Sequence, residues 1–232
     1  MKIAFFTDIH GNKYVLDGFF SLTARHAVDL IVFCGDAFGY YYHTEEILNR
    51  FRACANLVCI KGNHDRRFLD LLDGRLNEQA LVSRFGNSYA VARQTVSARN
   101  VAYVKSWPEQ WEYSVDGLRL AAFHGSPAGL DDRVYPDTPL HDETLFAGYT
   151  HVVLGHTHHK MERRLPGGCL VLNPGSIGQQ RDGKGCSCII LDTASGRYSF
   201  HTVEYDVRLL RSDVEQHDPG NTTLIEVLYR ER

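Results

Sequence analysis

The sequence predicts an α/β fold in which a mixed sheet, or two packed sheets, carries helices on the outside. The first half alternates short apolar runs with segments of helical periodicity, an order typical of parallel strands joined by right-handed crossovers. The second half contains pairs of short strands around turn residues, which indicate hairpins. No linker interrupts the chain, so we expect a single domain over residues 1–232.

The elements of the first half follow from buried-strand runs and from helical spacing. Apolar residues at positions 15, 16, 19 and 20 have the spacing of one helix face. The expected strands span residues 3–6, 30–34 and 57–60. The expected helices span residues 14–27 and 44–55, and residues 66–105 are expected to be mostly helical.

Three hairpins are expected in the second half. Asp116-Gly117, a strong turn signal, separates strands 111–115 and 118–123. Glycine-containing turns also separate strand 160–165 from 169–172, and strand 186–192 from 197–205. A further short strand is expected at 152–154. The tail, about residues 206–232, has a helical pattern broken at Pro219-Gly220 and could be a dimer element or a cover for a sheet edge.

The composition is that of an ordinary globular protein, with 44% apolar and 23% charged residues. A net charge of −3 without a basic run predicts no dedicated nucleic-acid-binding surface. The six cysteines form no CxxC pair, so we expect reduced thiols rather than disulfides. The N-terminal apolar run stops at Phe6, which is too short for a signal peptide or a membrane span and predicts a cytoplasmic protein.

Five apolar strands each end in a polar block. The blocks are Asp8-Ile9-His10, Gly35-Asp36, Gly62-Asn63-His64-Asp65, His124-Gly125 and Gly155-His156-Thr157-His158. In open α/β sheets ligands bind at the carboxyl ends of the strands, so these five ends can converge on one point. A single histidine is more often a surface or core residue than a ligand, but five such blocks in order favour a shared site.

These residue types predict a metal centre, because Asp and His bind borderline and hard divalent metals and no cysteine joins the set. Asp8 and His10 lie two residues apart and can hold one ion from the same side, as can one of His156 and His158. Seven candidate ligands are more than the four that one tetrahedral zinc ion takes. They suit two ions about 3.5–4 Å apart that share a carboxylate. The seven are Asp8, His10, Asp36, Asn63, His124, His156 and His158.

A pair of divalent ions predicts phosphoester hydrolysis. Such a pair clamps a phosphate and lowers the pKa of a bridging water, which as hydroxide attacks phosphorus in line. The leaving oxygen then needs a proton or a positive group, and His64, directly after Asn63, could supply either.

The five blocks resemble the calcineurin-like metallophosphoesterase superfamily, whose pattern is D-x-H, G-D, G-N-H-D or G-N-H-E, a histidine block and G-H-x-H. This sequence has DIH at 8–10, GD at 35–36, GNHD at 62–65, HG at 124–125 and GHTH at 155–158, so the resemblance spans residues 1 to about 192. The run NPGSIGQQRDG at 173–183 is similar to the smaller bacterial and archaeal phosphodiesterases of the superfamily. The resemblance implies two packed mixed β-sheets, a β-sandwich, flanked by helices in four layers α/β/β/α.

The resemblance also implies a role for each matching position. Asp8, His10 and His158 would hold one metal, and Asn63, His124 and His156 the other, with Asp36 as the bridge. His64 would lie beside the substrate phosphate as general acid or charge stabiliser, with Asp65 orienting it. The implied cofactors are two divalent ions, manganese first, with iron, zinc, nickel or cobalt as alternatives for the same ligand set.

One departure from the superfamily concerns the substrate. Its protein serine/threonine phosphatases carry Asp-Arg-Gly shortly after the Gly-Asp block, and that arginine helps hold a monoester phosphate. The corresponding stretch here, GDAFGYYYH at 35–43, has no arginine. This difference favours the phosphodiesterase branch and disfavours the dinucleoside-polyphosphate hydrolases.

A few further positions carry weaker predictions. Arg181, in the 173–183 run, could contact substrate, and Asn12 could line the site or cap a helix. Arg66 and Arg67 follow the GNHD block, where a solvated helix start is favoured over a phosphate contact. The substrate-binding candidates are Asn12, Asn63, His64 and Arg181, and the catalytic candidates are His64 and Asp65.

The leading hypothesis is a metal-dependent phosphodiesterase that hydrolyses small phosphodiesters, nucleotides among them. A phosphomonoesterase or nucleotide pyrophosphohydrolase on the same dimetal core is the alternative. A non-catalytic interaction scaffold of the same fold is the third hypothesis, and the complete set of motif residues disfavours it. We expect a small phosphoester as the partner and no membrane association, and we leave a homo-oligomer open.

Overall fold

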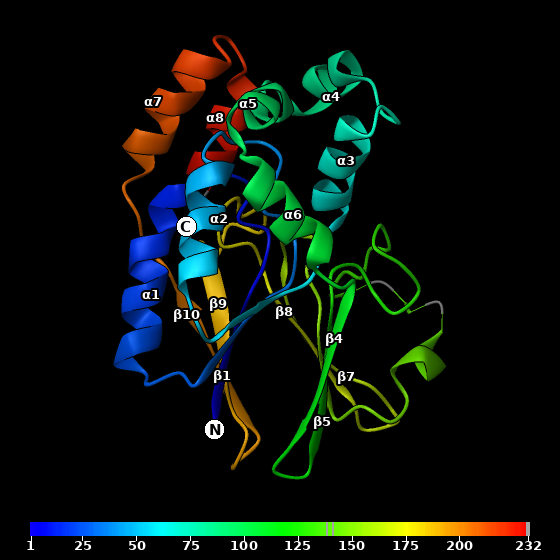
Figure 1. Ribbon diagram of the computed structural model, residues 1–232. Coiled ribbons are helices and arrows are strands. Elements are labelled where there is room, and N and C mark those ends of the chain that lie inside the picture. Colours follow the sequence, from blue (N-terminus) through cyan, green and yellow to red (C-terminus); the bar gives the residue numbers. More distant parts are fainter. Residues whose placement is uncertain (138, 141, 231–232) are drawn as a thin grey trace.

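Two five-stranded sheets form the centre of the computed structural model, which describes residues 1–137, 139–140 and 142–230 (Figure 1). The first sheet has the strand order β10-β9-β1-β2-β3. Its strands are β1 (Lys2–Phe6), β2 (Leu30–Phe33), β3 (Leu57–Cys59), β9 (Ser187–Asp192) and β10 (Arg197–Thr202). The strands β1, β2 and β3 are parallel, as the sequence pattern predicted, and β9 runs antiparallel to β1.

The second sheet has the order β4-β5-β6-β8-β7. Its strands are β4 (Gln110–Val115), β5 (Leu118–Phe123), β6 (His151–Val153), β7 (Lys160–Arg164) and β8 (Leu170–Pro174). The central strands β5, β6 and β8 are parallel, and the hairpin partners β4 and β7 form antiparallel edges. Asp116 and Gly117 both have positive φ, at 50° and 79°, which is the backbone that a tight two-residue hairpin turn requires.

The first sheet is buried on both faces, and this explains its continuous apolar runs. Ile3 and Phe5 of β1 pack between the two sheets. Ala4 and Phe6 of the same strand point the other way and pack under the helices. The prediction of two packed mixed sheets with helices outside is therefore confirmed.

The helices cover the outer face and one end of the first sheet (Figure 1). They are η1 (Lys13–Val15), α1 (Leu16–Arg25), α2 (Thr44–Ala53), α3 (Asn63–Leu72), α4 (Glu78–Phe85), α5 (Ser88–Thr95) and α6 (Ala98–Ser106). Within the described residues, no helix has both the length and the apolar character that crossing a bilayer requires.

The layer over the second sheet consists mostly of loop in its described part. The described residues of the segment 126–150 cover that sheet and contribute Val134 and Phe146 to its outer core, and they contain only the short helix η2 (Glu143–Phe146). Pro127, Pro136 and Pro139 lie in this segment. Proline lacks a backbone N–H and breaks a helix interior, so the segment packs as a loop.

The C-terminal tail supports the loop after β2. Its helices are α7 (Val207–His217), α8 (Thr222–Glu226) and η3 (Val227–Tyr229). Leu210 and Val214 of α7 pack against Tyr41 and Tyr42 of that loop. The hydroxyl of Tyr42 also donates to Asp218 at 2.7 Å. The tail, whose task the sequence left open, thus holds the loop that follows Asp36.

Candidate metal centre

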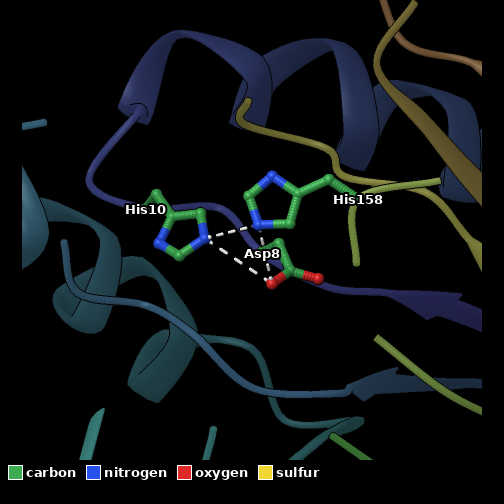
Figure 2. Close-up of side chains that lie close together, drawn as sticks. All are labelled: Asp8, His10 and His158. Carbon is green, nitrogen blue, oxygen red and sulfur yellow. Dashed lines mark hydrogen bonds and ion pairs between the residues drawn. The ribbon is translucent and has the colours of Figure 1, made fainter. Parts of the chain in front are cut away.

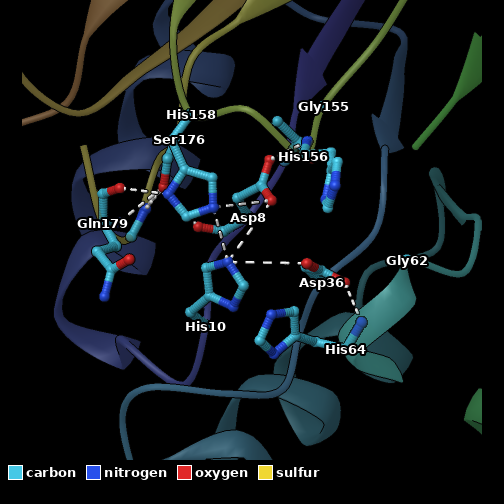
Figure 3. Close-up of polar contacts among 12 residues, drawn as sticks. Asp8, His10, Asp36, Gly62, His64, Gly155, His156, His158, Ser176 and Gln179 are labelled. Atoms are coloured by element: carbon cyan, nitrogen blue, oxygen red, sulfur yellow. Dashed lines mark hydrogen bonds and ion pairs between the residues drawn. The ribbon is translucent and has the colours of Figure 1, made fainter. Parts of the chain in front are cut away.

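The five polar blocks follow the strand ends, on loops or at the start of α3, and their side chains meet at one place. Figure 3 shows residues of four blocks, and His124 of the fifth lies 3.1 Å from Asp36. Several of their residues adopt the left-handed backbone that non-glycine residues rarely use, namely Asp8 (φ 57°), His10 (48°), Asp36 (67°), His156 (67°) and His158 (60°). Each such residue costs roughly 1–3 kcal/mol, and such strain gathers at functional sites. The loops therefore hold these side chains in orientations that an unstrained backbone would not give.

Asp8, His10 and His158 form the first cluster (Figure 2). The Nε2 atoms of His10 and His158 are 3.0 Å apart. Asp8 Oδ1 lies 3.2 Å from His158 Nε2 and 3.5 Å from His10 Nε2. All three side chains are buried, and their ligand atoms point at one another.

This first cluster fits a cation. His10 Nδ1 donates to the carbonyl of Phe38 and His158 Nδ1 donates to that of Gln179, each at 2.6 Å, since a carbonyl can only accept. In the neutral rings Nε2 is then an unprotonated acceptor. Asp8 Oδ1 is buried without a hydrogen-bond partner among the described residues. Three acceptors facing one another in a buried space repel unless a positive ion lies between them.

Asp36, His124 and His156 form the second cluster, with Asn63 beside it. His124 Nδ1 donates to the carbonyl of Cys34 at 2.9 Å, which turns Nε2 toward Asp36 Oδ2 at 3.1 Å and Asn63 Oδ1 at 3.0 Å. The Asn63 amide nitrogen donates to Asp131 at 2.8 Å, and this fixes its oxygen on the side of His124.

Asp36 faces both clusters. Its Oδ2 is 3.1 Å from His124 Nε2 and 3.8 Å from His10 Nε2. Its Oδ1 accepts the backbone N–H of His64 at 2.7 Å (Figure 3). The carboxylate thus lies where a shared ligand would lie. We call the seven predicted ligands together the metal floor: Asp8, His10, Asp36, Asn63, His124, His156 and His158.

Burial and charge prepare most of the metal floor for metal binding. Burial alone raises the pKa of Asp8 and of Asp36, but their histidine neighbours outweigh it and hold both pKa values below the ordinary carboxyl range. Burial lowers the pKa of His156 and of His158 to about 4. At neutral pH these aspartates are charged and these histidines neutral, which is the form that binds metal.

His124 differs from the other histidines. Burial lowers its pKa, but the adjacent Asp36 carboxylate outweighs burial and raises the pKa of His124 to about 10. A proton on Nε2 then bridges His124 to Asp36 in the metal-free protein. A metal at the second cluster would displace that proton, because a coordinating imidazole is neutral.

His64 is oriented by Tyr89 and not by Asp65. The Tyr89 hydroxyl lies 2.7 Å from His64 Nδ1, and both residues are buried. Asp65 instead accepts the backbone N–H groups of Gly62 at 2.8 Å, Asp36 at 2.9 Å and Ala37 at 2.8 Å. Asp65 is the third residue of α3, where a carboxylate reaches back to the helix start. The predicted orienting role of Asp65 is therefore corrected: it ties α3 to the loop after β2.

The other substrate-binding candidates differ in placement. Asn12 is fully buried, donates to the Gly178 carbonyl at 3.0 Å and accepts from Tyr14 N at 3.2 Å. It caps η1 and joins two loops, so the capping alternative fits its contacts better than a substrate contact. Arg181 lies at the pocket over the metal floor, with Asn63 and His64.

Four arginines line that pocket, and we call them the arginine rim: Arg67, Arg84, Arg133 and Arg181. Arg84 and Arg133 were not predicted from the sequence, because α4 and residues 126–150 carry no motif. Tyr89 was not predicted for the same reason, since nothing in the spacing of α5 marks a partner of His64. Tyr40 and Phe85 add aromatic walls to the pocket.

Fold and site together define a metal-dependent phosphoesterase. Residues 1–196 match the family model of the calcineurin-like phosphoesterase superfamily domain, and the chain therefore belongs to this superfamily. The superfamily implies a site for two metals, and the two clusters are candidates for it.

Three similar proteins cover most or all of the chain. An uncharacterized protein of Methanocaldococcus jannaschii is 25% identical over 227 residues, which cover 89% of this chain and 88% of the relative. The crystal structure of a metallophosphoesterase from Sphaerobacter thermophilus is 26% identical, with a TM-score of 0.79 over 99% of this chain and 98% of that one. A hypothetical protein from Pyrococcus horikoshii shares the fold at 15% identity, with a TM-score of 0.82 over 100% and 98% of the two chains.

Proposed function

We propose that this protein hydrolyses small phosphodiesters, nucleotides among them, with two bound divalent ions. The observation that carries the proposal is the pair of adjacent buried clusters with Asp36 facing both. Asp8, His10 and His158 would hold one ion, and His124, His156 and Asn63 the other. Manganese is the first candidate, with iron, zinc, nickel or cobalt as alternatives, because nitrogen and oxygen ligands accept all of them.

When bound, such a metal pair polarises a phosphate and lowers the pKa of a water between the ions. The side chains of this protein fix where that chemistry takes place. The carbonyls of Phe38 and Gln179 orient the two histidines of the first cluster. Asp131 orients Asn63 in the second cluster. In this proposal the substrate phosphate would enter the pocket that Asn63, His156, His158 and His64 line.

His64 would stabilise the charge that develops on the leaving oxygen by donating a hydrogen bond to it. If the Tyr89 hydroxyl donates to Nδ1, the neutral ring carries its proton on Nε2. Burial lowers the pKa of His64 well below its ordinary value, so the ring is neutral and Nε2–H is the available donor. An alkoxide leaving group gains most from such a donor. Tyr89 is thus proposed as a positioning residue for His64.

The preference for diesters rests on the loop after Asp36. In that loop the protein phosphatases of the superfamily carry the arginine that holds a monoester, whereas this chain brings Tyr40 to the pocket. The Tyr40 ring lies against His10 and His64, with centroid distances of 4.7 and 5.2 Å. No positive group from this loop therefore meets the dianion of a monoester.

The arginine rim favours a second candidate. Because Arg67, Arg84, Arg133 and Arg181 reach the pocket from other segments, a monoester or a nucleotide pyrophosphate could find its positive partners there. A phosphomonoesterase or nucleotide pyrophosphohydrolase on the same metal floor is accordingly the alternative function.

The test compares bis(4-nitrophenyl) phosphate with 4-nitrophenyl phosphate, using chelator-stripped wild type and Asp36→Asn with and without added Mn²⁺. We expect metal-restored cleavage of the diester, a lower rate on the monoester, and neither in Asp36→Asn. A strong preference for the monoester would move the protein to the alternative function. Absence of both turnover and metal uptake would contradict the proposal that this protein is a metal-dependent hydrolase.

A further inference from the structure

The arginine rim is drawn from four separate segments of the chain. Arg67 lies on α3 and Arg84 on α4, while Arg133 belongs to the loop after β5 and Arg181 to the loop between β8 and β9. All four side chains line the pocket that also contains Asp36, His64, His156 and His158. Charges gathered from such distant positions in the sequence are not explained by the solvated face of any one helix.

Most of the rim charge is not neutralised within the protein. Among the described residues, ion pairs with carboxylates are absent for Arg84, Arg133 and Arg181, and only Arg67 has one, with Asp131 at 2.7 Å. The partners of the others are uncharged or aromatic. Arg133 Nε lies 3.3 Å from His156 Nε2, Arg181 donates to Tyr40 Oη at 2.8 Å, and Arg84 lies over the Phe85 ring.

The metal floor does not supply the negative charge that would neutralise the arginine rim. Its seven residues include only two carboxylates, Asp8 and Asp36, so two divalent ions would already leave the floor positive. One phosphodiester carries a single negative charge, which the floor can satisfy. Like charges at the pocket mouth repel one another unless an anion lies between them. The rim therefore suits a negative group beyond the phosphate that is cleaved.

We propose that the arginine rim binds a second phosphate group of the substrate, so that the natural substrate is a phosphoester carrying at least one further phosphate. The proposal deepens the proposed function and rests on it for the position of the cleaved bond. Guanidinium groups suit this task, because their planar fork donates two parallel hydrogen bonds to phosphate oxygens. A nucleotide with a second phosphate is a substrate of this class.

The first measurement is binding to the metal-loaded protein by calorimetry at constant free metal. The probes are adenosine 5′-monophosphate, adenosine 5′-diphosphate and adenosine 3′,5′-bisphosphate, which differ in the presence and position of the second phosphate. We expect adenosine 5′-diphosphate, adenosine 3′,5′-bisphosphate or both to bind about tenfold tighter than adenosine 5′-monophosphate. We call this difference in affinity the diphosphate advantage. Equal affinities for all three probes would overturn the subsite.

Variants separate the arginines from the metals. Arg84→Gln and Arg181→Gln, alone and together, should reduce the diphosphate advantage, and the double variant should lose most of it. Arg93→Gln is the matched control, because Arg93 lies on α5, pairs with Glu78 and does not line the pocket. If the double variant keeps the diphosphate advantage, the second phosphate binds at the metal floor. That result would overturn the proposal.

Hydrolysis of bis(4-nitrophenyl) phosphate keeps the two proposals apart, because this diester has no second phosphate. Turnover of the diester combined with equal affinities would retain the function and refute the subsite. An arginine-dependent diphosphate advantage without turnover of any phosphoester would support the subsite and contradict the function.

Discussion

The metal floor and the arginine rim meet at the same pocket but are built in different ways. The ligands of the floor are buried, several adopt strained backbone, and their rings are held by backbone carbonyls. The rim side chains are half-buried or exposed and come from helices and loops outside the motif blocks. The floor has the rigidity that chemistry requires, whereas the rim has the adaptability of a surface that selects substrates.

The largest expected effect tests the floor. Asp36→Asn removes the carboxylate that faces both clusters while keeping its shape. We expect kcat/KM for the diester to fall about 10³-fold, the upper range for removing one electrostatic stabiliser. Steady-state kinetics and metal content by mass spectrometry check this. Activity near that of wild type would mean that Asp36 is not shared between metals.

His64 lines the same pocket as the metal floor and the arginine rim. Its replacement should lower the rate less than Asp36→Asn does. His64→Gln should lower kcat about 10²-fold on a diester with an alkyl leaving group, the range for removing one hydrogen-bond donor to a developing charge. The loss should shrink with 4-nitrophenolate, which leaves without a proton, and metal content should stay unchanged. An equal loss on both leaving groups would contradict a hydrogen bond from His64 to the leaving oxygen.

Tyr89→Phe tests the positioning of His64, because it removes only the hydroxyl that contacts His64 Nδ1. We expect about a tenfold loss on the alkyl ester, the size of one hydrogen bond in the transition state, and a smaller loss on the nitrophenyl ester. Tyr103→Phe is the control, since its hydroxyl meets Cys59 Sγ at 3.5 Å outside the pocket. A leaving-group-independent loss would give Tyr89 a structural role only.

The smallest expected effect is at the rim. Arg181→Gln should raise KM for a diphosphate substrate about fivefold, the contribution of one partly exposed charged hydrogen bond, with kcat and metal content retained. Arg197→Gln, an exposed arginine of β10, is the control. A drop in bound metal in Arg181→Gln would show that the rim supports the floor and would end the distinction between them.

The floor was predictable from the sequence because its signal is local. Each block follows a buried strand, and parallel strands bring their carboxyl ends to one edge, so the sequence alone places Asp8, Asp36 and Asn63 together. The hairpin at Asp116-Gly117 was predictable for the same reason, since the positive φ of the turn selects those residues.

The rim was not predictable, because its residues meet only through tertiary packing. Arg84 and Arg133 have no fixed spacing from a motif, and the position of α4 relative to the loop after β5 is not encoded in either segment. The orienting role of Asp65 was implied by the resemblance to the superfamily and not by the spacing of these residues. At the start of α3 that carboxylate satisfies backbone N–H groups instead, and Tyr89 arrives from α5.

The central claim is that the metal floor binds two ions, and the most direct measurement is the stoichiometry of Mn²⁺ binding to the chelator-stripped protein by calorimetry. We predict two ions per chain for wild type, and one each for His158→Asn and His124→Asn, which damage different clusters. A single ion in wild type, or two ions in both variants, would contradict the claim.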